Sequence, residues 1–169
     1  KATPLSIKTQ DSIKTWVVDA YGEPRAGVAF AQGKGSVHFR DIEQDKWEKL
    51  TEFNLYKDDG FQPYALTLDG TFYVTARADK DKTALYRYDI ANRKIYPDPV
   101  VTLKDYDFDG SLIYDAEKKR VVGVRYEADA EDTLWLDKEM KEYQSKIDSL
   151  LPGTINQIYF GRSSKAPFF

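Results

Sequence analysis

The chain contains a single histidine, His38, and this restricts the nucleophilic chemistry that it performs by itself. A serine hydrolase needs histidine as the general base beside its nucleophilic serine. The string Gly161-Arg162-Ser163-Ser164-Lys165 is the nearest approach to the G-x-S-x-G nucleophile elbow, but it lacks the second glycine. His38 stands in the middle of a run that alternates like a β-strand, which favours a structural role. We therefore expect no catalytic residue in this chain.

Asp105-Tyr106-Asp107-Phe108-Asp109-Gly110 matches the first half of a calcium-binding loop, D-x-D-x-D-G. Alternate carboxylates followed by glycine can fold around a hard cation, but the position of the closing carboxylate holds Ala116, and Glu117 comes one place late. The chain has no cysteine, which excludes disulfides, thiolate nucleophiles and cysteine-bound zinc. We expect the three aspartates to make turn hydrogen bonds, and we expect no metal and no cofactor site.

The remaining polar motifs fit turns better than sites. Carboxylate pairs occur at Asp58-Asp59, at Glu127 with Asp129, and at Glu131-Asp132. All lie in or beside predicted turns, where aspartate serves the backbone geometry. Gly33-Lys34-Gly35 is too short to form a phosphate-binding loop. The aromatic residues that fall at strand positions are expected to pack between sheets: Tyr86, Tyr88, Tyr126 and Trp135.

The composition indicates a folded chain rich in strands. Of the 169 residues, 41% are hydrophobic and 14% aromatic, with 12 tyrosines and 9 phenylalanines, and these aromatic residues favour strands. The net charge is −3 with both signs interspersed, which argues against a nucleic-acid partner. No apolar run approaches the roughly 20 residues that span a membrane, so we expect no membrane partner. The sequence starts at Lys1 and not at methionine, which suggests a fragment of a longer protein.

A repeat is the strongest internal signal. Three runs alternate apolar with other residues and end in aspartate, namely Ser36–Asp41, Ala84–Asp89 and Asp132–Asp137. Val37, Leu85 and Thr133 hold equivalent places in them, 48 residues apart in both steps. A period in the forties with about four short strands per unit is typical of β-propeller blades.

We therefore predict an all-β fold of about three four-stranded antiparallel propeller blades, at 15–54, 63–104 and 111–160, in one partial propeller domain over 1–169. The expected strands are 16–19, 25–30, 37–41 and 47–53; then 64–68, 71–75, 85–89 and 100–103; then 112–115, 121–126, 133–136 and one near 156–160. Asp69-Gly70 predicts a two-residue hairpin turn.

One segment departs from this pattern. Over 138–151, Met140, Tyr143, Ile147 and Leu150 share one helical face, with charged residues opposite. Asp137 is the expected N-cap, and Pro152-Gly153 ends the helix. We expect this inserted helix to cover a sheet edge; the alternative is a helix that binds a partner.

Five strings of the chain carry a family resemblance: Asp81–Asp89, Gly110–Asp115, Val122–Glu127, Trp16–Arg25, and Trp135-Leu136-Asp137 followed by a charged helix and Leu151-Pro152-Gly153. They resemble the N-terminal β-propeller of bacterial prolyl oligopeptidase family serine peptidases, especially dipeptidyl-peptidase and acylaminoacyl-peptidase-like members. The resemblance covers most of 16–156, and the last stretch, 159–169, does not continue it. It implies a bacterial periplasmic or cytoplasmic protein. No catalytic residue carries over, because the family's serine, aspartate and histidine belong to a separate α/β-hydrolase domain.

The resemblance implies a non-catalytic role, in which the propeller gates and shapes the access of short peptides to the hydrolase domain. One alternative is a propeller-type binding or scaffolding module with no associated enzyme. Another is a free-standing hydrolase that uses carboxylates and a metal. Three blades do not close a ring, so we also expect self-association through exposed apolar faces, with Val17, Val28 and Phe39 on one side. The other face would contain Leu112, Ile113, Val122, Val124 and Trp135. The alternative is that the helix over 138–151 folds back and covers one exposed face, which would permit a monomer.

Overall fold

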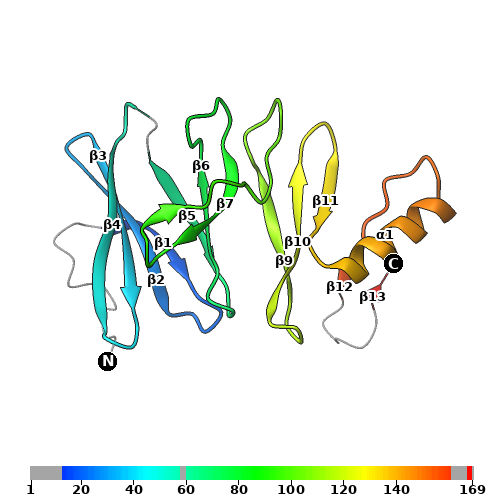
Figure 1. The fold of residues 1–169 in the computed structure, drawn as a ribbon, viewed down its shortest axis with the longest axis horizontal. Helices are drawn as coiled ribbons and strands as arrows, with labels where there is room; N and C mark the ends of the chain where they lie inside the picture. The colour runs from blue at the N-terminus through cyan, green and yellow to red at the C-terminus, as the bar shows by residue number, and fades with distance from the viewer. Residues whose placement is uncertain (1–12, 58–59, 161–166, 169) are drawn as a thin grey trace. The chain divides into compact units, whose positions relative to one another are not determined.

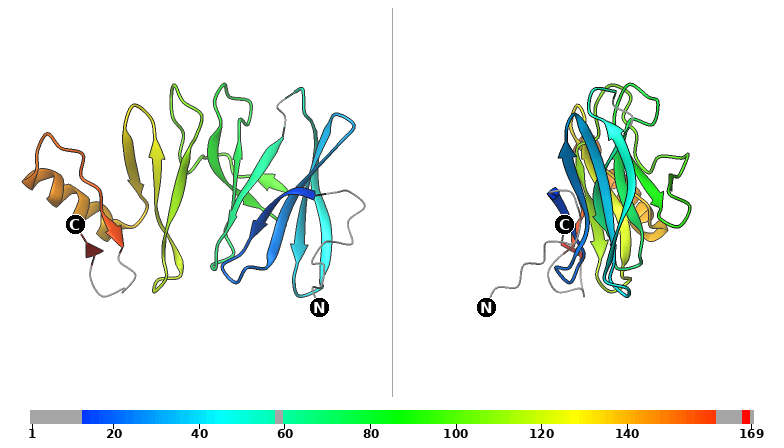
Figure 2. Two further views of the ribbon diagram at one scale, coloured as in Figure 1. Left: turned by 180° about the vertical axis from the view of Figure 1, so that it is seen from behind. Right: turned by 90° about the vertical axis from the view of Figure 1, so that its left-hand side faces the viewer.

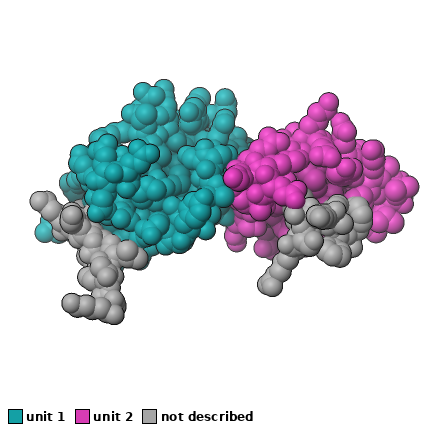
Figure 3. Space-filling view, turned by 90° about the horizontal axis from the view of Figure 1, so that it is seen from below, with its two compact units in different colours: residues 1–107 teal, residues 108–169 magenta. Residues whose placement is uncertain are grey.

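The structure, a computed structural model, describes residues 13–57, 60–160 and 167–168. The chain forms two compact units, Lys1–Asp107 and Phe108–Phe169, coloured separately in Figure 3. Each unit is described below by itself. Among the described residues, no helix is long and apolar enough to cross a membrane.

The first unit contains two four-stranded antiparallel sheets, each with its strands in chain order (Figure 1). Sheet 1 is built from β1 (Ile13–Val18), β2 (Pro24–Ala31), β3 (Lys34–Asp41) and β4 (Lys46–Asn54). Sheet 2 is built from β5 (Phe61–Leu66), β6 (Phe72–Ala76), β7 (Ala84–Asp89) and β8 (Lys94–Ile95). This up-and-down order within each sheet is the arrangement of a propeller blade.

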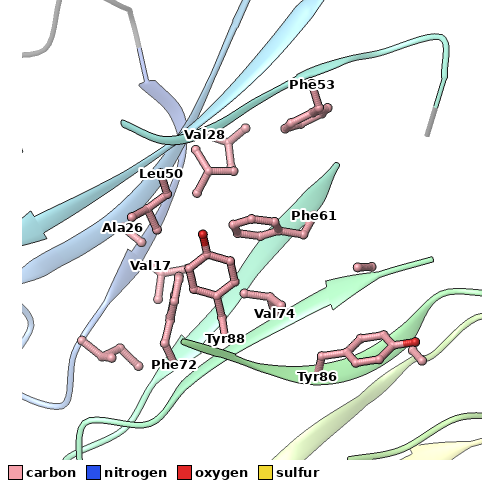
Figure 4. Close-up of a cluster of buried hydrophobic side chains, with 14 residues drawn as sticks. Val17, Ala26, Val28, Leu50, Phe53, Phe61, Phe72, Val74, Tyr86 and Tyr88 are labelled. Atoms are coloured by element: carbon pink, nitrogen blue, oxygen red, sulfur yellow. The ribbon is translucent and has the colours of Figure 1, made fainter. Parts of the chain in front are cut away.

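The core of the first unit lies between these two sheets (Figure 4). Alternate residues along each strand point to the same face, so Ala26, Val28 and Val37 of sheet 1 reach the same cluster as Phe72 and Val74 of sheet 2. The aromatic rings of Phe39 and Phe72 lie 5.6 Å apart across the cluster. The period-2 pattern of the sequence therefore produces two sheets that bury one face against each other.

The turns show how glycine sets strand register. β2 and β3 join through Gln32 and Gly33, both with positive φ (50° and 76°), as a type I′ hairpin requires. The Asp69-Gly70 turn differs from the two-residue hairpin predicted for it. The Thr67 N–H donates to Thr71 O, which leaves a three-residue loop with Gly70 at φ 81°. That conformation is typical of a three-residue hairpin.

The second unit contains sheet 3, one helix and a short hairpin (Figures 1 and 2). Sheet 3 has the order β11-β10-β9, formed by β9 (Gly110–Asp115), β10 (Arg120–Glu127) and β11 (Glu131–Trp135). Helix α1 (Lys138–Leu150) follows β11 and contacts it, and both views place it on the β11 side of the sheet. The strands β12 (Tyr159–Phe160) and β13 (Pro167–Phe168) pair with each other.

Helix α1 confirms the predicted insertion and its N-cap. The Asp137 carboxylate accepts hydrogen bonds from the backbone N–H groups of Glu139 and Met140. Met140 and the half-buried Ile147 pack with Val122 and Trp135 of sheet 3. Of the predicted apolar face, Tyr143 and Leu150 stay exposed. The helix thus covers part of sheet 3 with its N-terminal and central turns.

The all-β class and three antiparallel sheets are confirmed, but two outer strands were placed wrongly. In sheet 2 the fourth strand is Lys94–Ile95 rather than 100–103, and Val101 makes only an isolated bridge to Leu85. In sheet 3 the strand expected near 156–160 is absent, because Tyr159–Phe160 pairs with Pro167–Phe168. The described sheets remain separate and do not close a ring.

The expected exposed apolar faces are also wrong. Val17 and Val28 lie in the first unit's core, with exposed fractions of 9% and 0%, and Phe39 packs against that core. In the second unit Val122, Val124 and Trp135 are buried, while Leu112 and Ile113 are half-buried. Sheet 2 covers Val17, Val28 and Phe39 in the first unit, and helix α1 packs with Val122 and Trp135 in the second, which removes the stated reason for self-association through these residues.

Candidate functional site

His38 belongs to a buried serine–histidine pair on the face of sheet 1 that points away from Val37 and the core. The His38 Nε2 lies 3.0 Å from the Ser36 hydroxyl, because residues two apart on a strand share a face. Both residues are only 6% exposed. The pair combines a hydroxyl with a base, but both side chains are buried within the sheet, where a substrate cannot reach them. Sequence reasoning found His38 and missed Ser36, although the i, i+2 spacing within a predicted strand was the available signal.

A charged network occupies the same face of sheet 1. The Glu52 carboxylate lies 2.7 Å from the Lys34 ammonium and 2.9 Å from that of Lys49. Hydrogen bonds from both lysines, followed by their charges, lower the pKa of Glu52 to about 2. The Gly33-Lys34-Gly35 string therefore forms a hairpin whose lysine binds a carboxylate within the sheet. Trp16 and Trp47 of this sheet make an edge-to-face contact, with ring centroids 5.6 Å apart.

The aspartate-rich motif makes loop contacts in this structure. The Asp107 carboxylate accepts hydrogen bonds from the Thr83 N–H (2.8 Å) and the Thr83 hydroxyl (3.0 Å). These two bonds lower the pKa of Asp107. The backbone carbonyl of Asp109 accepts from the Glu127 N–H and so continues the β9–β10 pairing. Within the described ranges, no three or more His, Cys, Asp or Glu side chains come together as potential metal ligands.

The first unit contains a cavity of about 190 Å³ between its two sheets. The end of β4 and the start of β5 contribute Phe53, Gly60 and Phe61 to its wall. Arg77 and Thr83, beyond β6, supply polar groups on the other side. The Phe53 ring in its wall lies against Gly35 and Gly60, where any Cβ atom would lie within 2.5 Å of ring carbons.

The second unit contains a larger groove of about 440 Å³, which we call the β11 groove. One wall is the β10–β11 turn with the start of β11, and the other is helix α1 with the loop that follows it. The lining residues are Tyr126, Ala128, Asp129, Ala130, Glu131, Asp132, Gln144, Asp148, Thr154, Ile155 and Asn156. Four of these are carboxylates and none is basic.

Hydrogen bonds hold the two walls of the β11 groove in place. The Trp135 indole N–H donates to the Gln144 side-chain oxygen at 3.0 Å. The Gln144 amide in turn donates to the Asp148 carboxylate and to the Asn156 backbone carbonyl, at 2.9 and 2.8 Å. A single glutamine thereby ties β11, α1 and the following loop together.

The carboxylates of the groove have mainly neutral partners. The Tyr126 hydroxyl donates to Asp132 at 2.9 Å, and Asp148 accepts from two amide groups. Burial and the bond to Asp132 raise the pKa of Tyr126. Glu131 pairs with Arg125 at 3.1 Å. The groove thus keeps an excess of negative charge.

The predicted residues divide between these places. Tyr86 and Tyr88 lie in the core of the first unit, and Trp135 lies in that of the second, where its indole N–H also donates to Gln144. Tyr126 lines the β11 groove and donates to Asp132. Asp129 and the Glu131-Asp132 pair, which we predicted to be turn residues, line the β11 groove. Asp148, which the sequence analysis did not single out, lines it as well. Asp58-Asp59 and Gly161–Lys165 lie outside the described residues.

The comparisons with known proteins give one structural likeness. No family model matches the chain, and no curated protein matches it. Among solved structures, TolB from Acinetobacter baumannii matches with a TM-score of 0.47 and 16% sequence identity. The match covers 78% of this chain and 31% of TolB, so the chain spans less than a third of that structure. The blade-like character of the chain is read from its own strand order.

Proposed function

We propose that this chain is a non-catalytic blade segment of a larger β-propeller, in which it gates and shapes the access of short peptides to a hydrolase domain elsewhere in the protein. The α/β-hydrolase domain of a prolyl oligopeptidase family serine peptidase is the proposed partner. Acylation and deacylation would take place entirely in that domain.

One observation carries the proposal: two consecutive four-stranded up-and-down sheets bury a shared face, as neighbouring blades do. A blade buries both faces when it stands between two others, so a segment of this kind gains from further blades on either side.

The strings that resemble the peptidase family support the proposal further, because they fall on the blade strands. Asp81–Asp89 ends as β7, and Gly110–Asp115 is β9. Val122–Glu127 lies within β10, and Trp135-Leu136-Asp137 leads into helix α1. The structural role of His38, buried beside Ser36, agrees with chemistry supplied from outside this chain.

The test uses the complete open reading frame. The full protein and this chain are each incubated with a fluorophosphonate probe and with chromogenic peptides of two to thirty residues. We expect labelling and turnover only in the full protein, and a preference for the shorter peptides that is lost when 13–160 is deleted. A full protein without a labelled serine, or one whose length preference survives the deletion, would overturn the proposal.

The second candidate is a propeller-type binding module with no associated enzyme, and the β11 groove favours it. The same experiment separates the two. A full protein that lacks any labelled nucleophile but retains peptide binding supports the binding module.

A further inference from the structure

We propose that the β11 groove binds an extended basic peptide, which adds to sheet 3 as its fourth strand and places lysine or arginine side chains among the groove carboxylates. This inference is independent of the proposed peptidase role, since it concerns the described residues of the second unit alone. It rests on three observations: an unpaired strand edge, the charge of the groove, and the position of the opposite wall.

The first observation is the outer edge of β11, which pairs with no strand among the described residues. The Glu127 N–H donates to Asp109 O on the β9 side, and the Leu136 N–H donates to Val122 O. Alternate backbone groups of β10 therefore point to opposite neighbours. It follows that Asp132 and Leu134 bond to β10, while the backbone groups of Glu131 and Thr133 point outward.

Those outward groups pair with no strand in the described part of the chain. The Thr133 N–H turns to the carboxylate of the preceding Asp132 at 2.6 Å. The Thr133 hydroxyl is buried without a hydrogen-bond partner. An edge whose backbone groups pair with no other strand is a template for strand addition. The Thr133 N–H would then exchange its bond to the Asp132 carboxylate for one to the added strand. The two sheets of the first unit each have the fourth strand that sheet 3 lacks.

The second observation is charge. The groove beside this edge is lined by Asp129, Glu131, Asp132 and Asp148, and none of its lining residues is basic. Asp132 and Asp148 accept their hydrogen bonds from neutral groups. Several carboxylates around one cavity favour a cationic occupant, because charge complementarity sets the choice of partner. Long lysine or arginine side chains also pack their aliphatic stems on apolar surface, and Ile155 supplies such surface at 67% exposure.

The third observation is the opposite wall. Gln144 accepts from Trp135 and donates to Asp148 and Asn156, so hydrogen bonds within the unit fix the position of this wall. Preorganisation reduces the ordering cost of binding. A strand on the outer side of β11 would lie about 4.8 Å from it, between β11 and this wall.

Binding is measured by fluorescence polarisation with the full chain and a seven-residue peptide alternating lysine with valine, capped at both ends and carrying a neutral fluorophore. A peptide with glutamate in place of lysine is the charge control. Two N-methylated lysine peptides are the backbone test, because an added strand uses the N–H groups of alternate residues only. Methylation of the N–H groups that face β11 should abolish binding. Methylation of the other alternate N–H groups should leave the affinity within about threefold of that of the unmethylated peptide.

The protein variants test the site itself. Asp132→Asn with Asp148→Asn removes two groove charges and should weaken the lysine peptide roughly fivefold or more. Glu117→Gln with Glu142→Gln removes two exposed charges outside the groove lining and should change the affinity by less than twofold. Thr133→Pro deletes the outward N–H and should also weaken binding of the lysine peptide. The variant should still fold, because proline is tolerated on edge strands.

Three results would overturn the proposal. The first is no binding of the lysine peptide up to about 1 mM, which corresponds to only about 4 kcal/mol. The second is equal binding of the glutamate peptide, or an equal effect of the groove and control variants. The third is equal affinity for both N-methylated peptides, which would exclude strand addition even if Thr133→Pro fails to fold.

Discussion

Asp137 is predicted to hold helix α1 on sheet 3 through two separable contributions. Its carboxylate caps the helix by accepting from Glu139 N–H (3.0 Å) and Met140 N–H (3.3 Å). It also pairs with Arg120 at 2.6 Å and Lys118 at 3.2 Å. Its side chain is only 4% exposed, whereas those of Arg120 and Lys118 are 53% and 37% exposed. Loss of the carboxylate therefore leaves both cations in contact with water.

The magnitudes follow from these contacts. A lost N-cap costs about 1 kcal/mol, and each ion pair with a half-exposed cation contributes about 0.5 kcal/mol. Asp137→Ala should therefore lower the free energy of unfolding by about 2 kcal/mol. Asp137→Asn keeps a good cap and loses only the charges, so it should cost about 1 kcal/mol. Urea unfolding followed by circular dichroism at 222 nm monitors α1, the single helix among the described residues.

The pH dependence provides a second check. Burial acts to raise the pKa of Asp137, but hydrogen bonds from Lys118 and the Met140 N–H, with the charges of Lys118 and Arg120, outweigh it and lower the pKa below 3.8. Because the folded pKa is depressed, the stabilisation is complete above the unfolded value and is lost as the pH falls through the folded one. The difference in free energy of unfolding between wild type and Asp137→Asn should therefore shrink below pH 3.8. Equal losses for the alanine and asparagine variants at pH 7, or a gap that widens in acid, would refute this reasoning.

Three further predictions concern the first unit. The carboxyl of Glu52 should titrate by NMR with a pKa of about 2, and this pKa should move toward its usual 4.5 in 1 M salt, because salt screens its exposed lysine pairs. A pKa above 4 at low salt would contradict the network. Gly35→Ala places a Cβ 2.3 Å from the Phe53 ring and should cost about 1–3 kcal/mol in urea unfolding, with a smaller loss in a Phe53→Leu background; equal losses in both backgrounds would exclude this clash. Asp107→Ala removes two bonds to Thr83 and should lower the melting temperature by a few degrees, equally with and without millimolar calcium; a calcium-induced rise that the substitution abolishes would establish a metal site.

The strands were predictable where the sequence alternates over five or more residues. β3, β7 and β10 have buried residues at every second position or in continuous runs, and their ranges agree with the prediction to within three residues. β8 was missed because Lys94–Ile95 is too short for any periodicity to appear. Its place was given to the apolar run at 100–103, where Val101 is buried but makes only one bridge.

The end of sheet 3 was mispredicted for a tertiary reason. The apolar residues near 156–160 were assigned to a fourth strand, but Ile158 is 1% exposed in the cluster of Val122, Trp135 and Met140. That cluster exists because α1 folds onto the sheet, a contact that local pattern does not encode. The β11 groove was missed for the same reason. Its carboxylates look like separate turn residues along the chain, and Gln144 joins them only through side-chain contacts.

The burial pattern explains why sheet 3 can keep an open edge. Sheets 1 and 2 obtain their core from each other, whereas sheet 3 obtains part of its core from α1, which supplies Met140 and Ile147. A fourth strand is therefore not needed to bury Val122 and Trp135. Open edges invite pairing between copies, and charged residues on the edge oppose it. Glu131 and Asp132 place negative charge along β11, so two β11 edges repel each other. The same carboxylates attract a basic strand, which makes this edge selective for a partner unlike itself.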